Sequence, residues 1–230
     1  MVQRFEEAFH DYPFCLLNDT ACFAYAEYVF ANITEPNFAY INVSKGVGAC
    51  LFANGKMLRG AGGNATQFGH FSVDRNGPLC ACGNHGCVER VVGENALTER
   101  AEACGIDLTR FAGRKPLYCD IGAMAEDGDA HAKELIKDLA VDLSFAISNL
   151  ITLFNPSLVV IGGMGVNLGP FFLSNIRDEV QNSGFKEFVS NTWIQYSTLG
   201  LDSELGGAAR YYIDHYYDFF EQMQGGLYAD

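Results

Sequence analysis

The sequence predicts an α/β fold, because short apolar stretches of strand length alternate with a long stretch of helical periodicity. Residues 38–43 and 158–161 are apolar runs bounded by polar or glycine-rich segments, as expected of buried strands. Between them, Leu, Ile and Ala recur at helical spacing through residues 124–154, which predicts a long helix with one buried face. Strands and helices in this order favour a sheet covered by helices.

The bulk composition describes a globular chain that can bury a sizeable core. Its 230 residues are 49% hydrophobic and 19% charged, which excludes a disordered polymer. The formal net charge of −13 argues against direct binding of this chain to DNA, because duplex binding requires Lys and Arg side chains that contact phosphates. We see neither an apolar run of about 20 residues nor a signal-peptide core, so we expect no membrane partner. Eight cysteines, three of them clustered, favour a reducing cytoplasm with a metal site over a disulfide scaffold.

The N-terminal segment predicts a helix, a strand and a second helix. Residues 2–10 resemble the end of a helix, and the apolar run 14–17 predicts a buried strand. Asn18-Asp19 then opens a helix through about residue 31, with either side chain as a natural N-cap. Two interpretations of Asp19 stay open: it serves only as a cap, or it is a carboxylate at the end of a strand, where open α/β sheets bind ligands.

A hairpin follows. Residues 38–43 and 49–53 predict two strands joined by a turn at 45–48, and Asn54-Gly55 is a type I′ turn signal into residues 56–58. Glycine-rich turns can present backbone N–H groups to a phosphate, but an ordinary hairpin is the interpretation we favour here. Residues 60–68 are predicted to be a loop.

The second half of the chain predicts further helices and strands. Helices are expected at 89–103, 124–154, 169–181 and 205–220, and strands at 158–161 and 193–197. A turn with several glycines leaves the strand at 158–161. The last helix is rich in aromatic residues, which suggests that it packs on another lobe or a second subunit.

Residues 69–89 carry the densest chemistry, with His70, Cys80, Cys82 and Cys87 inside 18 residues. Thiolates and imidazole together suit tetrahedral Zn²⁺, and the turn at 83–86 can fold Cys87 back toward the other two cysteines. The alternatives are a disulfide or small buried hydrophobic side chains. His85 also competes for the fourth position, although its place inside the tight turn favours solvent. We predict a structural zinc loop.

The loop resembles the signature of the ROK family (repressors, open reading frames and sugar kinases). Gly69-His70 and the run Gly-Pro-x-Cys-x-Cys-Gly-Asn-x-Gly-Cys-x-Glu at 77–89 carry most of the resemblance. Further matches follow in the family's order: Asn18-Asp19, Gly46-Val47-Gly48, Asn155-Pro156-Ser157, Val159 to Gly163, Leu199-Gly200 and Gly206-Gly207-Ala208-Ala209. The resemblance covers nearly the whole chain and implies the actin-like ATPase (ribonuclease H-like) fold, essentially its C-terminal lobe.

The same resemblance implies a domain organisation. Residues 1–18 would be a remnant of the N-terminal lobe, 19–222 the C-terminal lobe with its zinc loop at 69–89, and 223–230 a frayed tail. The family's Asp-Gly-Gly-Thr phosphate loop does not precede Asn18, so we expect about a lobe's worth of chain to be absent from this sequence. Because family members are commonly dimers or tetramers, we expect a homodimer or homotetramer.

By resemblance, the ligand is a hexose, an amino-hexose or a sugar phosphate, held by Asn18, Asp19, Gln67, His70 and Glu89. Gln67 stands where the family's kinases have a glutamate, so a charge-assisted hydrogen bond to the sugar is lost. Glu89 has a second interpretation, as a first-turn residue favoured by the helix dipole. His70 would place one ring nitrogen on zinc and leave the other for a hydroxyl.

In a kinase the resemblance implies ATP and Mg²⁺ as cofactors. Asp19 would be the catalytic base. The nucleotide-binding residues would be Gly46, Gly48, Gly162 and Gly163. The usual Gly-Thr-Gly of the phosphate turn is Ser44-Lys45-Gly46 in this chain, which removes a glycine and a hydroxyl from the place where phosphates would lie.

Three functions follow from these observations. The first is the sugar-sensing, effector-binding region of a ROK-family transcriptional regulator that contacts DNA only through an N-terminal domain outside this sequence. Three features favour it. They are the altered turn, Gln67 and the sequence of residues 68–78, which resembles the regulators more than the kinases. The second is the C-terminal lobe of an ATP-dependent hexose kinase of the glucokinase kind, supported by Asn18-Asp19. The third is a zinc-stabilised structural module without a ligand. We expect the first, and therefore no enzyme.

Overall fold

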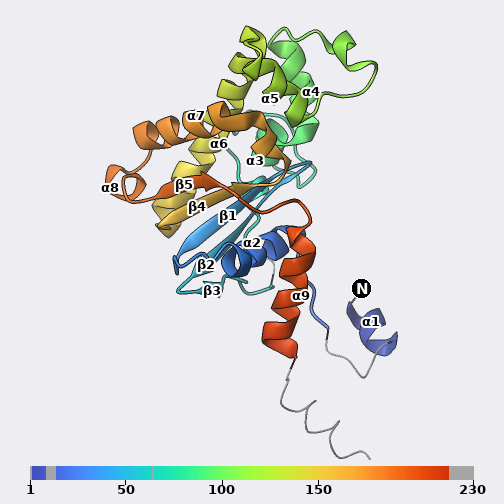
Figure 1. Ribbon diagram of the computed structural model, residues 1–230, viewed down its shortest axis with the longest axis vertical. Helices are drawn as coiled ribbons and strands as arrows, with labels where there is room; N and C mark the ends of the chain where they lie inside the picture. The colour runs from blue at the N-terminus through green and yellow to red at the C-terminus, as the bar shows by residue number, and fades with distance from the viewer. Residues whose placement is uncertain (1, 9–13, 64, 218–230) are drawn as a thin grey trace, which may run out of the picture. The chain divides into compact units, whose positions relative to one another are not determined.

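The computed structural model describes residues 2–8, 14–63 and 65–217, which fall into two units. The first unit contains the described residues up to 33 and from 199 onward, and the second contains residues 34–198. Figure 1 labels the elements of both units. The domain boundaries that we expect at residues 18 and 222 stay predictions, and the expected tail at 223–230 lies outside the described residues.

The second unit is built on one five-stranded sheet (Figure 1). Its strands are β1 (Phe38–Val43), β2 (Val47–Ala53), β3 (Lys56–Met57), β4 (Leu158–Gly162) and β5 (Trp193–Tyr196), in the order β3-β2-β1-β4-β5. β1 pairs antiparallel with β2 and parallel with β4, so the sheet is mixed. Asn54 and Gly55 have φ values of 52° and 73°, as the predicted type I′ turn between β2 and β3 requires. The expected α/β class is confirmed.

Helices accompany this sheet. They are α3 (Val88–Val92), α4 (Glu94–Ala103), α5 (Tyr118–Glu126), α6 (Ala130–Phe154), α7 (Gly169–Ser183) and α8 (Lys186–Val189), with 3₁₀ turns η1 (Phe68–His70), η2 (Leu108–Phe111) and η3 (Met164–Leu168). α6 buries Leu135, Leu139 and Leu143 completely, each contributing about 1.5–3 kcal/mol by leaving water. These leucines belong to one core with Ile41 of β1 and Phe172 of α7. α6 and α7 lie side by side (Figure 1).

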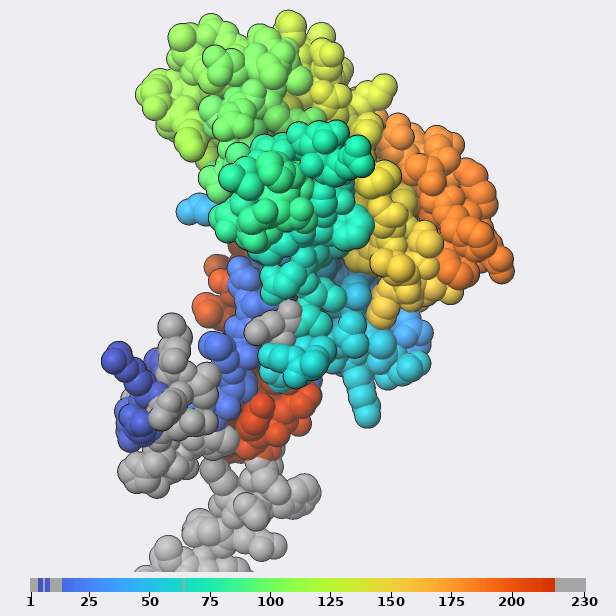
Figure 2. All heavy atoms as spheres, turned by 180° about the vertical axis from the view of Figure 1, so that it is seen from behind, coloured from blue at the N-terminus to red at the C-terminus, as the bar shows by residue number. Residues whose placement is uncertain are grey.

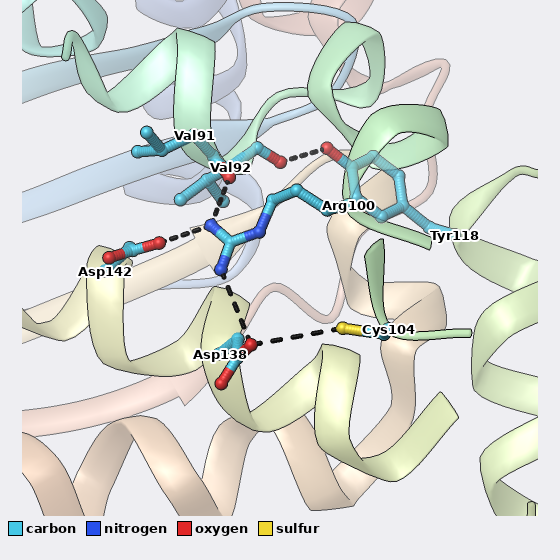
Figure 3. Close-up of polar contacts among 7 residues, drawn as sticks. All are labelled: Val91, Val92, Arg100, Cys104, Tyr118, Asp138 and Asp142. Carbon is cyan, nitrogen blue, oxygen red and sulfur yellow. Dashed lines mark hydrogen bonds and ion pairs between the residues drawn. The ribbon is translucent and has the colours of Figure 1, made fainter. Parts of the chain in front are cut away.

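A polar network fastens the α3–α4 junction to α6 (Figure 3). Arg100 Nη1 donates to the carbonyl oxygen of Val91 at 2.8 Å and also to the carboxylate of Asp142. The buried Tyr118 donates its hydroxyl to the carbonyl oxygen of Val92 at 2.7 Å. Two carbonyl groups that the end of α3 leaves without helical partners are thereby satisfied. The junction is held from both sides, which fixes the orientation of α3.

Two predicted helices are each interrupted. The helix expected at 89–103 is broken at Gly93, whose ψ of 156° is extended; a Cβ there would lie 2.5 Å from the carbonyl oxygen of Glu89. The helix expected at 124–154 is broken at 127–129, where Gly128 has a φ of +94° and Asp129 caps α6 by accepting from the Ala132 N–H at 3.1 Å. Helical periodicity continues across both breaks in the sequence, which is why the pattern alone misses them.

The first unit contains α1 (Val2–Ala8), α2 (Asp19–Phe30) and α9 (Ser203–Tyr216). The strand predicted at 14–17 is wrong: these residues form no strand, and Leu16 is 63% exposed. No strand in the described part of the chain pairs with them, and an apolar run without a neighbour gains no ladder hydrogen bonds. The last helix begins two residues earlier than expected and is described to Tyr216, so residues 218–220 of the predicted span lie outside the described part.

α2 and α9 pack closely at Gly207. A Cβ on Gly207 would lie 1.9 Å from the carbonyl oxygen of Cys22 and 2.9 Å from the backbone nitrogen of Ala26. Tyr25 of α2 also donates its hydroxyl to Asp214 of α9 at 2.7 Å. The neighbouring Gly206 has more room, since its Cβ would meet only the ring of Phe30, at 3.1 Å.

We therefore predict that Gly207→Ala destabilises the first unit, whereas Gly206→Ala does not. Alanine gains about 1 kcal/mol of helix propensity at either position. At Gly207 the two helix backbones must separate, which we expect to outweigh that gain by about 1–3 kcal/mol. Urea unfolding of both variants measures the difference, and equal stabilities for the two variants would contradict the close contact.

Among the residues that the structure describes, no helix has both the length and the apolar character needed to cross a membrane.

Candidate metal and ligand site

The segment between η1 and α3 folds into a small loop held by its own backbone. Two isolated β-bridges, Ser72 with Cys87 and Leu79 with His85, bring its ends together. Gly86 has a φ of +59°, and a Cβ there would lie 1.8 Å from the carbonyl oxygen of Asp74. Only glycine fits that position. The turn predicted at 83–86 therefore does return Cys87 toward the other cysteines.

The loop gathers four metal-ligating side chains. One donor atom each from His70, Cys80, Cys82 and Cys87 lies within 4.8 Å of the others. Cys80 Sγ is 3.6 Å from His70 Nδ1, and Cys82 Sγ is 3.6 Å from Cys87 Sγ. Tetrahedral Zn²⁺, with bonds of about 2.3 Å to sulfur and 2.0–2.1 Å to nitrogen, spaces its ligand atoms about 3.6–3.8 Å apart. The donor set and its spacing therefore fit zinc.

The competing interpretations find less support. All three loop cysteines are free thiols, and 3.6 Å is far beyond the ~2.05 Å of a disulfide bond. His85 is exposed, and its Nδ1 lies 3.0 Å from the carbonyl oxygen of Gly77. It stands outside the four-residue cluster, whereas His70 belongs to it.

The thiols of the cluster differ in their affinity for protons. Burial raises the pKa of Cys87 to about 12. A backbone hydrogen bond at Asn84 lowers the pKa of Cys82. A thiol with a raised pKa keeps its proton at neutral pH unless a cation stands next to it, and a coordinated metal removes that proton outright. The buried Cys87 would therefore lose its proton only when it coordinates a metal ion.

Gln67 and His70 line a pocket of about 400 Å³ beside the cluster. Most of the remaining lining is apolar and comes from β2, η1 and the C-terminal half of α6, including Leu51, Phe68 and Leu150. Figure 2 shows residues of the zinc-loop region, in teal and green, beside α6, in yellow, on one face. The structure thus brings two of the predicted ligand-binding side chains to one cavity.

Glu89 contacts the turn between β1 and β2 instead of lining this pocket. Its Oε2 accepts the backbone N–H of Val47 at 3.3 Å, and a Cβ on Gly46 would lie 2.4 Å from that oxygen. Glu89 is not among the residues that line the pocket of Gln67 and His70. The predicted sugar-binding glutamate therefore touches the glycine turn between β1 and β2.

The glycines predicted for nucleotide binding meet at the edge where β1 and β4 end. Asn42 of β1 pairs with Gly48 on one side and with Gly162 on the other. Gly163 leaves this edge with a φ of +79°, and a Cβ on it would lie 2.1 Å from Asn42 Oδ1 and 2.6 Å from Ser44 Oγ. This is the edge of an open sheet where ligands bind.

Sequence reasoning missed two residues there. Asn42 is 6% exposed, and its Oδ1 accepts a hydrogen bond from Ser44 Oγ at 3.1 Å. Ser44 Oγ in turn accepts the N–H of Met164 at 3.2 Å. A single asparagine inside an otherwise apolar strand was the signal that could have identified this position, since buried polar groups need partners.

Asn18 and Asp19 belong to the first unit and are exposed there. Asn18 is the N-cap of α2, because its side chain accepts the Ala21 N–H at 2.7 Å. Asp19 Oδ1 accepts the Thr20 N–H at 2.7 Å. The capping geometry is present, and the ligand role of both residues stays a prediction.

The mixed sheet, the glycine edge and the His-Cys₃ loop together define a protein of the repressor and sugar-kinase type. The chain belongs to the ROK family, whose model matches residues 1–214.

Its relatives include both kinds of protein. The xylose repressor of Bacillus subtilis is 28% identical over 91% of this chain and 53% of its own length. The transcriptional dual regulator NagC of Escherichia coli is 30% identical over 91% of this chain and 52% of its own length. A ROK glucokinase of Streptomyces griseus, solved with glucose and AMPPNP, superimposes with a TM-score of 0.76 at 26% identity, over 91% of this chain and 70% of that one.

The chain thus spans about half the length of the curated relatives that it matches. It is related both to transcriptional repressors and to sugar kinases, and the expected actin-like ATPase fold and NagC-like kinship agree with these relationships.

Proposed function

We propose that this chain is the sugar-sensing, effector-binding region of a cytoplasmic ROK-family transcriptional regulator. One observation carries the proposal: the turn that a kinase needs for ATP phosphates reads Ser44-Lys45-Gly46, and the Glu89 carboxylate accepts the Val47 N–H directly behind it. The turn lacks the first glycine and the threonine that the family's kinases carry at this place. The two repressors described above support the same assignment.

We further propose that His70, Cys80, Cys82 and Cys87 hold one zinc ion. The ion would supply rigidity to a loop that contains no regular helix or strand, and rigid loops preorganise hydrogen bonds to a ligand. His70 would then be fixed in the lining of the pocket that it shares with Gln67.

The proposed ligand is a hexose, an amino-hexose or one of their phosphates. Gln67, His70 and Glu89 are the residues of the second unit that we assign to it, and Asn18 and Asp19 those of the first. DNA would be contacted by another part of a longer protein, since the net charge of this chain is −13 and duplex binding needs basic side chains. A homodimer or homotetramer is part of the proposal.

Thermal unfolding with a sugar panel tests this function. The panel contains glucose, N-acetylglucosamine and N-acetylmannosamine, each also as its phosphate. At least one member is expected to raise the melting temperature, because a ligand that binds only the folded state stabilises it by mass action. Glu89→Ala should remove that shift, whereas Glu99→Ala, an exposed glutamate on α4, should keep it. A flat response to the whole panel would favour a structural module.

An alternative function is the C-terminal lobe of an ATP-dependent hexose kinase. The retained Asn18-Asp19 pair and the likeness to the Streptomyces glucokinase favour it. In that case Asp19 would take the proton of the sugar hydroxyl, and Gly46, Gly48, Gly162 and Gly163 would border ATP and Mg²⁺. Sugar-dependent release of ADP by the longer protein, abolished by Asp19→Asn, would establish the kinase and overturn the regulator.

A further inference from the structure

Glu89 occupies a position between two parts of the site. Two residues before it, Cys87 belongs to the His-Cys₃ cluster and is the N-cap of α3. On the other side, its carboxylate reaches the β1–β2 turn at Gly46 and Val47. Gly69, next to His70, also packs against Glu89, with 3.6 Å between the Glu89 Cβ and a Cβ built on Gly69. A single side chain therefore connects the metal loop to the turn.

The β1–β2 turn is itself a point where several segments meet. The carbonyl oxygen of Ser44 accepts the N–H of Glu94 at 3.1 Å and the hydroxyl of Tyr118 at 3.3 Å. The hydroxyl of Ser44 accepts the N–H of Met164, in the turn after β4, at 3.2 Å. A displacement of this turn would therefore be felt at the α3–α4 junction and at the glycine edge of the sheet.

We propose that Glu89 couples ligand binding to the β1–β2 turn, an inference that rests on the proposed sugar-sensing function. In the structure, the Glu89 carboxylate accepts the Val47 N–H and holds the turn. When a sugar hydroxyl donates a hydrogen bond to the Glu89 carboxylate, it replaces the bond from the Val47 N–H. The loss of that bond then loosens the Ser44 contacts. Glu89 acts in this way as a positioning residue for the glycine edge.

Two features of the contact favour such an exchange. The bond from Val47 is long, at 3.3 Å, whereas hydroxyl–carboxylate bonds are usually about 2.5–2.7 Å. The pocket lined by Gln67 and His70 does not include Glu89. A ligand shared with those two side chains would draw the Glu89 carboxylate toward the pocket.

The first experiment needs no ligand. Amide hydrogen exchange by NMR compares the unaltered chain with Glu89→Ala and Gly46→Ala. Gly46 has no positive φ, so alanine suits its backbone, but the new Cβ would lie 2.4 Å from Glu89 Oε2 and displace the carboxylate. Both variants should speed exchange of the Val47 amide by about tenfold or more, the loss expected for a hydrogen bond to a charged group. Exchange at Met164 should rise by a smaller factor.

The matched control is Glu99→Ala, which removes an exposed carboxylate from α4 and should change neither amide. The Gly46 variant leaves Glu89 in place, so it separates displacement of the carboxylate from any general damage caused by the Glu89 substitution. If Val47 exchanges at the original rate in both variants, the contact does not hold the turn and the proposal is overturned.

The second experiment adds each sugar of the panel, at the highest concentration used for thermal unfolding, to the unaltered chain. A sugar that raises the melting temperature should also speed Val47 exchange, and should leave it unchanged in Glu89→Ala. If a sugar binds and Val47 stays protected, the coupling is wrong while the sugar-sensing function stands. If no sugar binds, both the sugar-sensing function and the coupling are overturned. The first experiment then shows only whether the contact between Glu89 and Val47 holds the turn.

Discussion

Replacing Cys87 by serine is expected to abolish stoichiometric zinc binding and to lower the free energy of unfolding of the second unit by about 3 kcal/mol or more. Cys87 is fully buried at the start of α3. A serine hydroxyl is a poor zinc ligand, so three donors remain for a site that favours four. The substitution also leaves a buried hydroxyl at the metal position, which adds to the cost.

Metal analysis by mass spectrometry and urea unfolding measure the two parts of this prediction. Cys119→Ser is the matched control, because Cys119 is an exposed free thiol on α5, outside the cluster. It should keep about one zinc per chain and its original stability. A Cys87→Ser chain that retains one tightly bound zinc, or an unaltered chain that folds fully without metal, would contradict the assignment.

Gly69→Ala is expected to give the second large effect, a loss of about 2–4 kcal/mol in stability together with weaker zinc binding. The Cβ of alanine would lie 1.9 Å from the carbonyl oxygen of Val47 and 2.9 Å from its carbon. Both are backbone atoms of β2, so no rotation of a side chain relieves the clash. η1 has to move away from the strand by a distance on the order of 1 Å, and His70, the next residue, moves with it.

A competition titration with a chromophoric chelator measures the change in zinc affinity. Gly62→Ala serves as the control, since a Cβ there meets nothing within 4 Å and the glycine has no positive φ. It should leave both zinc affinity and stability unchanged. If Gly69→Ala binds zinc as tightly as the original chain, His70 does not depend on the contact between η1 and β2.

The metal cluster could be predicted from the sequence because its chemistry is local. Three cysteines and a histidine with glycines between them leave few ways to fold, and the structure gathers those four side chains. Their role as zinc ligands stays a prediction. The hairpin signal Asn54-Gly55 was equally local and is confirmed. In both cases the residues that decide the geometry are close neighbours in the chain.

The rest depended on contacts between distant segments. The breaks at Gly93 and Gly128 interrupt helices whose apolar periodicity continues, and Gly93 is required because Glu89 and Lys45 backbones lie against it. The strand predicted at 14–17 failed because no strand in the described chain pairs with it. The Asn42–Ser44–Met164 chain of hydrogen bonds joins residues 120 positions apart, which no short sequence pattern encodes.

The compact spacing of the cluster has a consequence for how the protein reaches its folded state. His70 and Cys87 are separated by a short loop, so closing it around an ion costs little chain entropy. β4, which completes the centre of the sheet next to β1, begins only at residue 158. The proposed metal-bound loop could therefore form during synthesis, while that strand is still being translated. Zinc supply would then act on the nascent chain, before the sheet exists.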